Sequence, residues 1–259
     1  MRSLTLFLII WHAFGCANRT VNPSFNVSCD DAEKILDRVE KNPRHLDRPL
    51  VIVGGFNDPG LGPLAEQAWL GDSIDGTPVL RVTIMFESSL GDCRKVLIDE
   101  VNRKFPGKQV DVIGISMGGL VARHAAAPIP GKPRLNVARM FTISAPHNGA
   151  VLAKLPTFDQ KVVDMRPGSK FLAELAKYDG QKNYELIPYV RLRDKTVGAQ
   201  YAAPAGATPW WVDTPPFQPA HVGALFDPRI TADIVLRLRN EQPLTHNPPA
   251  PLPDESTKS

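Results

Sequence analysis

The sequence predicts a domain of the α/β class, in which a mostly parallel sheet of about six strands carries helices on both faces. Three observations support this fold. The chain of 259 residues is long enough to bury the core of such a domain. Apolar runs typical of buried strands alternate with amphipathic segments typical of helices. One run, at residues 110–115, is apolar almost throughout, as expected for a strand covered on both faces of a parallel sheet.

The predicted strands and helices alternate along the chain, which is the pattern of parallel strands joined by crossover helices. The strands are expected at residues 49–56, 79–86, 110–115, 135–143 and 184–192. The helices are expected at residues 30–41, 61–70, 91–105, 118–127 and 228–239.

The α/β domain is predicted at residues 49–240, with a short lid-like insertion at about 150–182. Before this domain, residues 17–48 are expected to form an exposed spacer followed by a short helix. After it, residues 241–259 are rich in proline and are expected to form a disordered tail.

The balance of charges excludes one class of partner. The 30 basic and 27 acidic residues give a net charge of +3, and no basic run is interleaved with aromatic residues. We therefore expect no nucleic-acid partner. The chain also has neither an HExxH pattern nor paired CxxC patterns, so we expect no metal and no cofactor. The sequence does not indicate an oligomeric state.

The N-terminus has the pattern of a targeting segment. Arg2 is followed by an apolar run at residues 4–14 and then by Gly15 and Cys16. The run is about half the roughly 20 residues that a membrane-spanning helix needs, so we predict a signal peptide at residues 1–16. The end of this segment resembles the lipobox of bacterial lipoproteins. That resemblance implies lipidation of Cys16, a membrane anchor and a place in the cell envelope, in the periplasm or on the outer surface. Simple secretion and a retained or misassigned start are the alternatives.

The chain contains three cysteines. If Cys16 is lipidated, Cys29 and Cys93 remain, and export places them in an oxidising compartment. A disulfide between Cys29 and Cys93 is the resulting hypothesis. Two separately buried thiols are the alternative.

The apolar run at residues 110–115 leads into the pattern G-x-S-x-G, with Ser116 at its centre. Between a strand and a helix, this pattern makes a sharp turn that lifts the serine hydroxyl clear of the sheet, with the serine at positive φ. Small neighbours are then required, and Gly114, Gly118 and Gly119 meet this requirement. A glycine-rich turn with an incidental serine is the alternative, but the flanking strand and helix favour the motif. Ser116 is therefore the candidate nucleophile.

Several segments together resemble the bacterial lipases and esterases of the α/β-hydrolase fold. They are Gly-Gly-Phe at residues 54–56, Gly-Ile-Ser-Met-Gly-Gly at 114–119, Ser-Ala-Pro-His-Asn-Gly at 144–149 and Arg-Pro-Gly-Ser at 166–169. The resemblance spans residues 49–240 and implies that fold and serine-hydrolase chemistry. In one respect the chain departs from these relatives, which commonly carry histidine where Gly54 stands. The resemblance therefore does not say what holds this loop.

The resemblance also implies an oxyanion hole and an acid. In α/β hydrolases the hole takes one N–H from the residue after the nucleophile and one from the loop after an earlier strand. The corresponding residues are Met117 and Phe56. The acid usually lies just past the end of a later core strand, where this chain has Asp194. Asp213 is the alternative acid.

A serine hydroxyl needs a base, and the chain has six histidines. These hydrolases carry the nucleophile, the acid and the base in that order along the chain. His221 satisfies this order in a loop before the last predicted helix, whereas His147 precedes both candidate acids. His124 lies on the helix after Ser116 and points away from the edge that carries the nucleophile. The remaining histidines are disfavoured by position: His12, His45 and His246. A surface role is the alternative for His221.

These assignments predict a serine hydrolase that cleaves carboxylic esters of small molecules or lipids through an acyl-enzyme intermediate. An acyltransferase or thioesterase with the same triad is an alternative, as is a catalytically silent binding protein of the same fold. The apolar residues between Leu152 and Met165 either line an acyl pocket or lid, or only pack the insertion against the core. Trp210 and Trp211 belong to a lid, a pocket or the core.

Overall fold

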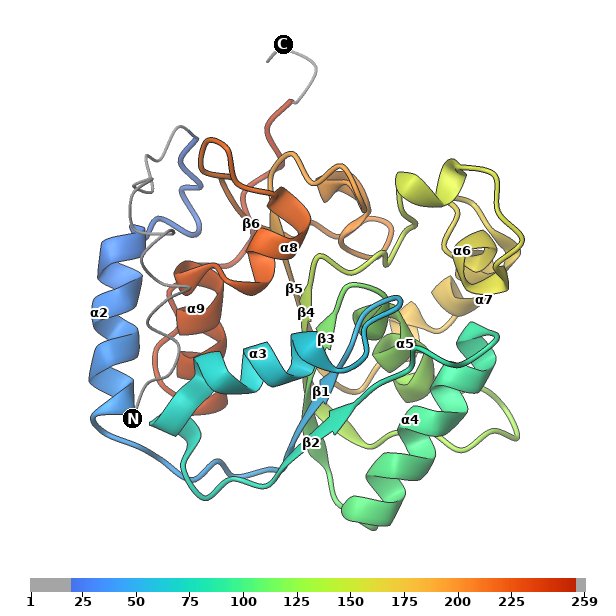
Figure 1. Ribbon diagram of the computed structural model, residues 1–259, viewed down its shortest axis with the longest axis horizontal. Coiled ribbons are helices and arrows are strands. Elements are labelled where there is room, and N and C mark those ends of the chain that lie inside the picture. Colours follow the sequence, from blue (N-terminus) through green and yellow to red (C-terminus); the bar gives the residue numbers. More distant parts are fainter. Residues whose placement is uncertain (1–19, 255–259) are drawn as a thin grey trace.

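The computed structural model of the protein describes residues 20–254 and contains a central sheet between two layers of helices (Figure 1). The predicted signal peptide at residues 1–16 and the predicted lipidation of Cys16 lie outside the described residues. Within the described part of the chain, none of the helices is both long and apolar enough to cross a membrane.

The sheet has six strands, all parallel, in the order β2-β1-β3-β4-β5-β6. Their bounds are β1 (Leu50–Val53), β2 (Val79–Val82), β3 (Val110–Ile115), β4 (Val137–Ile143), β5 (Glu185–Arg191) and β6 (Trp210–Val212). The predicted parallel sheet is confirmed. Because all strands run in one direction, their carboxyl ends meet at one edge, and residues that directly follow the strands collect there.

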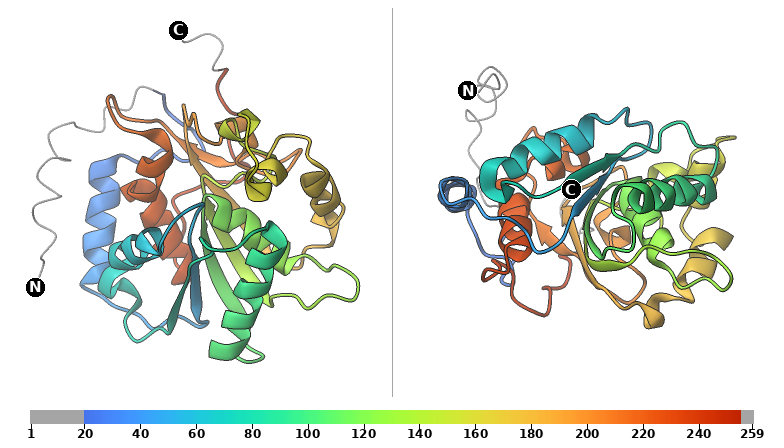
Figure 2. Two further views of the ribbon diagram at one scale, coloured as in Figure 1. Left: turned by 45° about the vertical axis from the view of Figure 1, so that its right-hand side comes forward. Right: turned by 90° about the horizontal axis from the view of Figure 1, so that it is seen from below.

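Helices cover both faces of the sheet (Figure 2). On one face α9 packs against α2 and α3, and on the other face α4 packs against α5. The bounds of the helices are α2 (Cys29–Glu40), α3 (Leu61–Leu70), α4 (Leu90–Lys104), α5 (Met117–Ala126), α6 (Gln160–Asp164), α7 (Lys170–Ala176), α8 (Ala220–Leu225) and α9 (Pro228–Leu238). Each face has its own hydrophobic core. Successive side chains of β3, such as Val112 and Ile113, point into opposite cores.

The helix ends follow local sequence signals. Ser89 is the N-cap of α4, and its hydroxyl accepts a hydrogen bond from the N–H of Asp92. Acidic Asp92 in the first turn and basic Arg103 and Lys104 in the last turn also complement the helix dipole. Signals of this kind explain why the predicted and observed ends of α4 agree closely.

The sixth strand, β6, is absent from the predicted strands because it has only three residues and no measurable alternation. Trp210 and Trp211 lie on this strand and are buried. The indole N–H of Trp211 donates a hydrogen bond to the carbonyl oxygen of Ala250 at 2.9 Å. Of the three roles considered for the two tryptophans, the structure therefore assigns the core.

The C-terminal tail differs from its prediction as a disordered segment. Up to residue 254 it packs against the domain: Ala250 is buried, and Leu252 packs against the cluster that contains Trp211. The buried carboxylate of Asp233 accepts a hydrogen bond from the N–H of Leu244 at 2.6 Å. Proline enrichment predicted disorder wrongly here, because an extended segment can be held by contacts with distant residues.

The segment before α2 is likewise only partly the exposed spacer that was predicted. Asn22 is buried, and its side-chain amide donates a hydrogen bond to the carbonyl oxygen of Trp211 at 2.9 Å. Phe25 is also buried, with its ring centre 6.3 Å from that of Tyr189. These two side chains hold the segment against the domain.

The predicted disulfide between Cys29 and Cys93 is wrong. Cys29 is disulfide-bonded, whereas Cys93 carries a free thiol in the core. The fold gives the reason. Cys29 begins α2, which packs on α9, and Cys93 lies on α4, which covers the opposite face of the sheet. Burial raises the pKa of the Cys93 thiol to about 11, so this thiol is unreactive at neutral pH.

One acidic side chain is buried in α3 without a partner. Glu66 is fully buried, and neither of its carboxyl oxygens has a hydrogen-bond partner within the described residues. Burial raises its pKa from 4.5 to about 8. The folded protein therefore keeps Glu66 protonated at neutral pH, while the unfolded chain ionises it.

This burial predicts a pH-dependent loss of stability. Because the folded protein binds one more proton than the unfolded chain between pH 4.5 and about 8, the free energy of unfolding falls as the pH rises through this interval. Glu66→Gln should remove the dependence. At pH 9 the free energy of unfolding of the variant should exceed that of the wild type by at most on the order of 5 kcal/mol, with little difference at pH 4. Urea unfolding of both proteins across this pH range measures the difference in the free energy of unfolding. If that free energy varies with pH in the same way for both proteins, the prediction is contradicted.

Candidate active site

Ser116 lies in the turn between β3 and α5, at the carboxyl edge of the sheet. Its φ is 50° and its ψ is −126°, a strained conformation that the surroundings must hold. Its N–H donates a hydrogen bond to the carbonyl oxygen of Ile143 at 2.8 Å, which ties the turn to β4. Gly118 allows α5 to approach β1, because a Cβ atom there would lie 2.4 Å from the carbonyl oxygen of Val53. The turn therefore has the geometry expected of the G-x-S-x-G pattern.

The structure brings together the three side chains of the predicted triad. The Nε2 atom of His221 lies 3.0 Å from the Oγ atom of Ser116, and its Nδ1 atom lies 2.8 Å from the Oδ2 atom of Asp194. A carboxylate can only accept, so Nδ1 carries the proton and Nε2 is free to accept one from the serine hydroxyl. His221 lies on the short helix α8, where the sequence predicted a loop.

Asp194 is held on both of its oxygens. Its Oδ1 atom accepts hydrogen bonds from the N–H groups of Thr196 at 2.8 Å and Val197 at 3.0 Å. Burial raises the pKa of Asp194, but the hydrogen bond and charge of His221 and the two backbone donors outweigh burial and lower it. Asp194 is therefore ionised at neutral pH and can stabilise a positively charged imidazole.

The other described histidines have different surroundings. His147 is buried, with Nε2 2.9 Å from the hydroxyl of Thr142, and burial lowers its pKa well below the usual value. The ring of His124 packs edge-on against Phe171, and burial, assisted by nearby arginine charge, lowers its pKa to about 4. Both rings are neutral at pH 7. Of the histidines within residues 20–254, only His221 is hydrogen-bonded to Ser116.

Asp213, the alternative acid, lies just past the end of β6 and is also buried. Its carboxylate faces a different partner, the guanidinium of Arg229, with an N–O distance of 2.5 Å. The same guanidinium binds the carboxylate of Asp227. Asp213 thus belongs to a buried ion network, while Asp194 contacts the imidazole.

The two backbone groups predicted for the oxyanion hole flank Ser116. Met117 is the first residue of α5, where the N–H groups have no partner within the helix. Phe56 follows Gly55, whose Cβ atom, if present, would lie 3.2 Å from the Cβ atom of Ser116. Among the described residues, neither the N–H of Met117 nor that of Phe56 is hydrogen-bonded to another protein group. Both donors are therefore free to bind an anionic oxygen.

Two residues that the sequence did not single out hold the loop after β1. The carboxylate of Asp58 accepts hydrogen bonds from the N–H groups of Gly60, Leu61 and Gly62, at distances from 2.7 to 3.3 Å. These bonds fix the loop where it enters α3, and an aspartate shortly before a helix is a recognisable capping signal.

Lys161 is the second residue that holds this loop. It is buried, its Nζ atom lies 5.2 Å from the centre of the Phe56 ring, and it donates a hydrogen bond to the carbonyl oxygen of Met85 at 3.2 Å. No pattern in the sequence indicates this contact, because Lys161 belongs to the insertion. Asp58 and Lys161 together hold the loop that begins at Gly54, which the resemblance to other hydrolases did not explain.

The insertion between β4 and β5 contains α6 and α7, and its apolar residues divide into two groups. Val162 and Met165 pack against the core. Leu152, Leu155 and Phe158 are half or more exposed. The insertion therefore both packs on the domain and presents apolar side chains at its surface.

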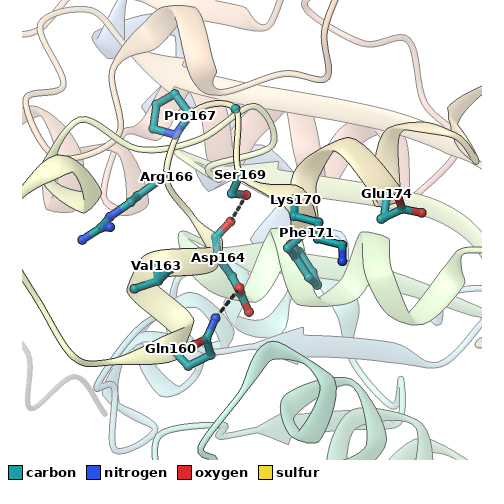
Figure 3. Close-up of a pocket in the computed structure, with 10 residues that line it drawn as sticks. Gln160, Val163, Asp164, Arg166, Pro167, Ser169, Lys170, Phe171 and Glu174 are labelled. Carbon is teal, nitrogen blue, oxygen red and sulfur yellow. Dashed lines mark hydrogen bonds between the residues drawn. The ribbon is translucent and has the colours of Figure 1, made fainter.

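An open groove of about 680 Å³ runs along this insertion (Figure 3). In Figure 3 the side-chain amide of Gln160 donates to the carboxylate of Asp164, and the hydroxyl of Ser169 donates to the backbone of Asp164. The residues that line the groove include neither Ser116 nor His221. The groove is thus separate from the hydrogen-bonded triad.

The triad has the geometry for general-base activation of a nucleophile. The serine hydroxyl is polarised by an imidazole, and the imidazole is oriented by an ionised carboxylate. The start of α5 and the loop at Gly55 adjoin the serine. This arrangement suits the attack of an oxygen nucleophile on an acyl carbon, with the negative charge of the intermediate directed at backbone donors.

Comparisons with known proteins identify the fold. A family described as "PGAP1-like alpha/beta domain" matches residues 80–182, which is less than half of the chain. No curated protein sequence matches the chain.

Several solved structures are similar. The mature lipase BlEst2 of Bacillus licheniformis is 18% identical with a TM-score of 0.55, covering 79% of this chain and 94% of its own. A gene product of Listeria innocua is 11% identical with a TM-score of 0.51, covering 77% of this chain and 96% of its own. The phospholipase PlaB of Legionella pneumophila is 12% identical with a TM-score of 0.50, covering 60% of this chain and only 45% of its own. This protein has the α/β-hydrolase fold, as predicted.

Proposed function

We propose that this protein is a serine hydrolase that cleaves carboxylic esters through a triad of Ser116, His221 and Asp194. The observation that carries the proposal is the chain of hydrogen bonds from the serine hydroxyl through the imidazole to the carboxylate, at 3.0 and 2.8 Å. Every member of this chain is oriented for proton transfer from the serine to the imidazole.

In the proposed reaction, His221 takes the proton of Ser116 while Oγ attacks the ester carbonyl. The N–H groups of Met117 and Phe56 bind the oxyanion that forms. The intermediate then expels the alcohol, which receives the proton from His221, and leaves an acyl group on Ser116. Water, activated by the same imidazole, hydrolyses this acyl-enzyme. The reaction needs no metal and no cofactor.

The proposed substrates are esters that carry an apolar acyl group, including lipids. Val222, next to the proposed base, is 56% exposed, and Phe217 in the preceding loop is 95% exposed. Leu155 and Phe158 add exposed apolar surface on the insertion. The lipase and the phospholipase among the similar structures also support an ester of this class.

A chain-length series of p-nitrophenyl esters tests this proposal. Purified protein should hydrolyse these esters and should react with a fluorophosphonate probe. Measuring rates below and above the micellar concentration separates the substrates: a preference for aggregated long-chain esters indicates a lipase, and a preference for soluble short ones an esterase. Protein that neither reacts with the probe nor cleaves any ester would contradict the proposed function.

Export to an oxidising compartment is a further part of the proposal. The disulfide at Cys29 supports it, because structural disulfides persist mainly in exported proteins. Fractionation of cells that express the full chain tests this location, and recovery in the cytosol with all thiols reduced would contradict it.

A further inference from the structure

A buried arginine lies beneath the helix that carries His221. Arg191 is the last residue of β5, close before Asp194, and its side chain is 1% exposed. A buried arginine at the end of a core strand is costly unless its guanidinium is fully paired. The contacts of this side chain therefore indicate what it does.

The guanidinium contacts the chain on both sides of α8. Its Nε atom donates to the Oδ2 atom of Asp227 at 2.7 Å, and Asp227 is the residue that caps α9 directly after α8. Its Nη1 atom donates to the Oε1 atom of Gln218 at 2.9 Å, in the loop directly before α8. One side chain thus fixes the two ends of the short helix.

The backbone of α8 also packs directly on this guanidinium. A Cβ atom on Gly223 would lie 2.3 Å from the Nη1 atom and 3.2 Å from the Cζ atom of Arg191. Only glycine lets the helix approach this closely. His221 is two residues before Gly223 on the same helix, so a contact that fixes Gly223 also bears on the position of the imidazole.

The charges around Arg191 are matched, which keeps its side chain in place. Asp227 binds Arg191 and Arg229, and Arg229 in turn binds Asp213. Burial raises the pKa of Asp227, but the two arginine charges outweigh burial and lower it to about 2. Asp227 is therefore ionised at neutral pH, and moving one guanidinium away from it would leave a buried charge without its full set of partners.

We infer that Arg191 is a positioning residue, which holds α8 so that the Nε2 atom of His221 stays within hydrogen-bonding distance of Ser116. This inference rests on the proposed function, because it concerns the reaction of that triad. It gives the ion network of Arg191, Asp227, Arg229 and Asp213 a part in placing the base.

Arg191→Lys and Gly223→Ala test the inference. Lysine keeps a positive charge beside Asp227 but lacks the rigid fork that also reaches Gln218. Alanine at 223 pushes α8 away from the guanidinium. Each variant should lower kcat by roughly 10- to 100-fold and leave KM within about threefold, because the imidazole is displaced while the other groups of the site stay in place. Labelling of Ser116 by the fluorophosphonate probe should slow by the same factor.

The double variant separates positioning from general stability. Lysine at 191 has no Nη1 atom for the new methyl group to meet, so the double variant should have the kcat of Arg191→Lys alone, within about twofold. If instead the two losses multiply, the contact between Arg191 and Gly223 does not position the helix. Gln218→Ala removes a single hydrogen bond and serves as a mild variant, with an expected loss in kcat of about threefold to tenfold.

Arg139 provides a matched control. It also forms a largely buried ion pair, with Asp111 at 2.6 Å, and contacts the end of α9, but it lies near the start of β4, away from the carboxyl ends of the strands. Arg139→Lys should lower the thermal midpoint and leave kcat unchanged. Wild-type kcat in Arg191→Lys, or an equal loss in Arg139→Lys, would overturn the inference. A wild-type protein without esterase activity or probe labelling would instead contradict the proposed function itself.

Discussion

Ser116→Ala is expected to lower the rate of ester hydrolysis by roughly 10⁴- to 10⁶-fold and to abolish reaction with a fluorophosphonate probe. The reason is that alanine has no oxygen to attack the carbonyl, while the backbone donors and the imidazole remain. Initial rates on a short p-nitrophenyl ester measure the first effect, and mass spectrometry of the probe adduct measures the second. Thermal unfolding should be nearly unchanged, because the hydroxyl makes a single hydrogen bond, to His221.

Ser144 provides the control for this experiment. It follows β4 as Ser116 follows β3, and its φ of 49° is almost the same. Its hydroxyl, however, is buried and has no hydrogen-bond partner among the described residues. Ser144→Ala should therefore keep the wild-type rate and the probe adduct. An Ser116→Ala protein that retains more than about a hundredth of the wild-type rate would exclude Ser116 as the nucleophile.

Asp194→Asn is expected to lower kcat by roughly 10⁴-fold. Asparagine has nearly the same shape, but it is neutral and its amide can donate to Nδ1, which favours the tautomer with the proton on Nε2. In that tautomer His221 cannot accept the proton of Ser116. Steady-state kinetics of the purified variant measure the loss, and KM should change little because the side chain of Asp194 is fully buried and does not face solvent.

Asp213→Asn distinguishes the two acids. Because its carboxylate pairs with Arg229, this change should lower the free energy of unfolding by about 1 to 3 kcal/mol. Its effect on kcat should stay within about tenfold. The opposite order of effects, with kcat lost at Asp213 and kept at Asp194, would show that the base is oriented by the other acid.

Local patterns in the sequence determined the fold class and the candidate nucleophile. The run before Ser116 and the glycines around it predict strand, turn and helix from neighbouring residues alone. Signals of this kind are short-range, because periodicity and turn geometry depend on residues close in the chain. Asp194 and His221 were predicted in another way, from the resemblance to α/β hydrolases and from the order of the three residues along the chain.

Contacts between distant residues decided the rest. The hydrogen bonds of His221 join positions 27 and 105 residues apart, and they favour Asp194 over Asp213, an alternative that the sequence had left open. The pairing of Cys29 and the packing of the tail on Trp211 likewise contradict predictions made from composition and spacing.

Arg191 illustrates the limit most clearly, since a single arginine at the end of a strand has no periodic or motif signal. Its proposed role depends on Asp227, Gln218 and Gly223, which lie far from it in the sequence and meet it only in the folded protein. A sequence specifies which groups need partners, through the cost of burying charge. Which partners meet is set by the way the strands and helices pack, and that is a property of the tertiary structure.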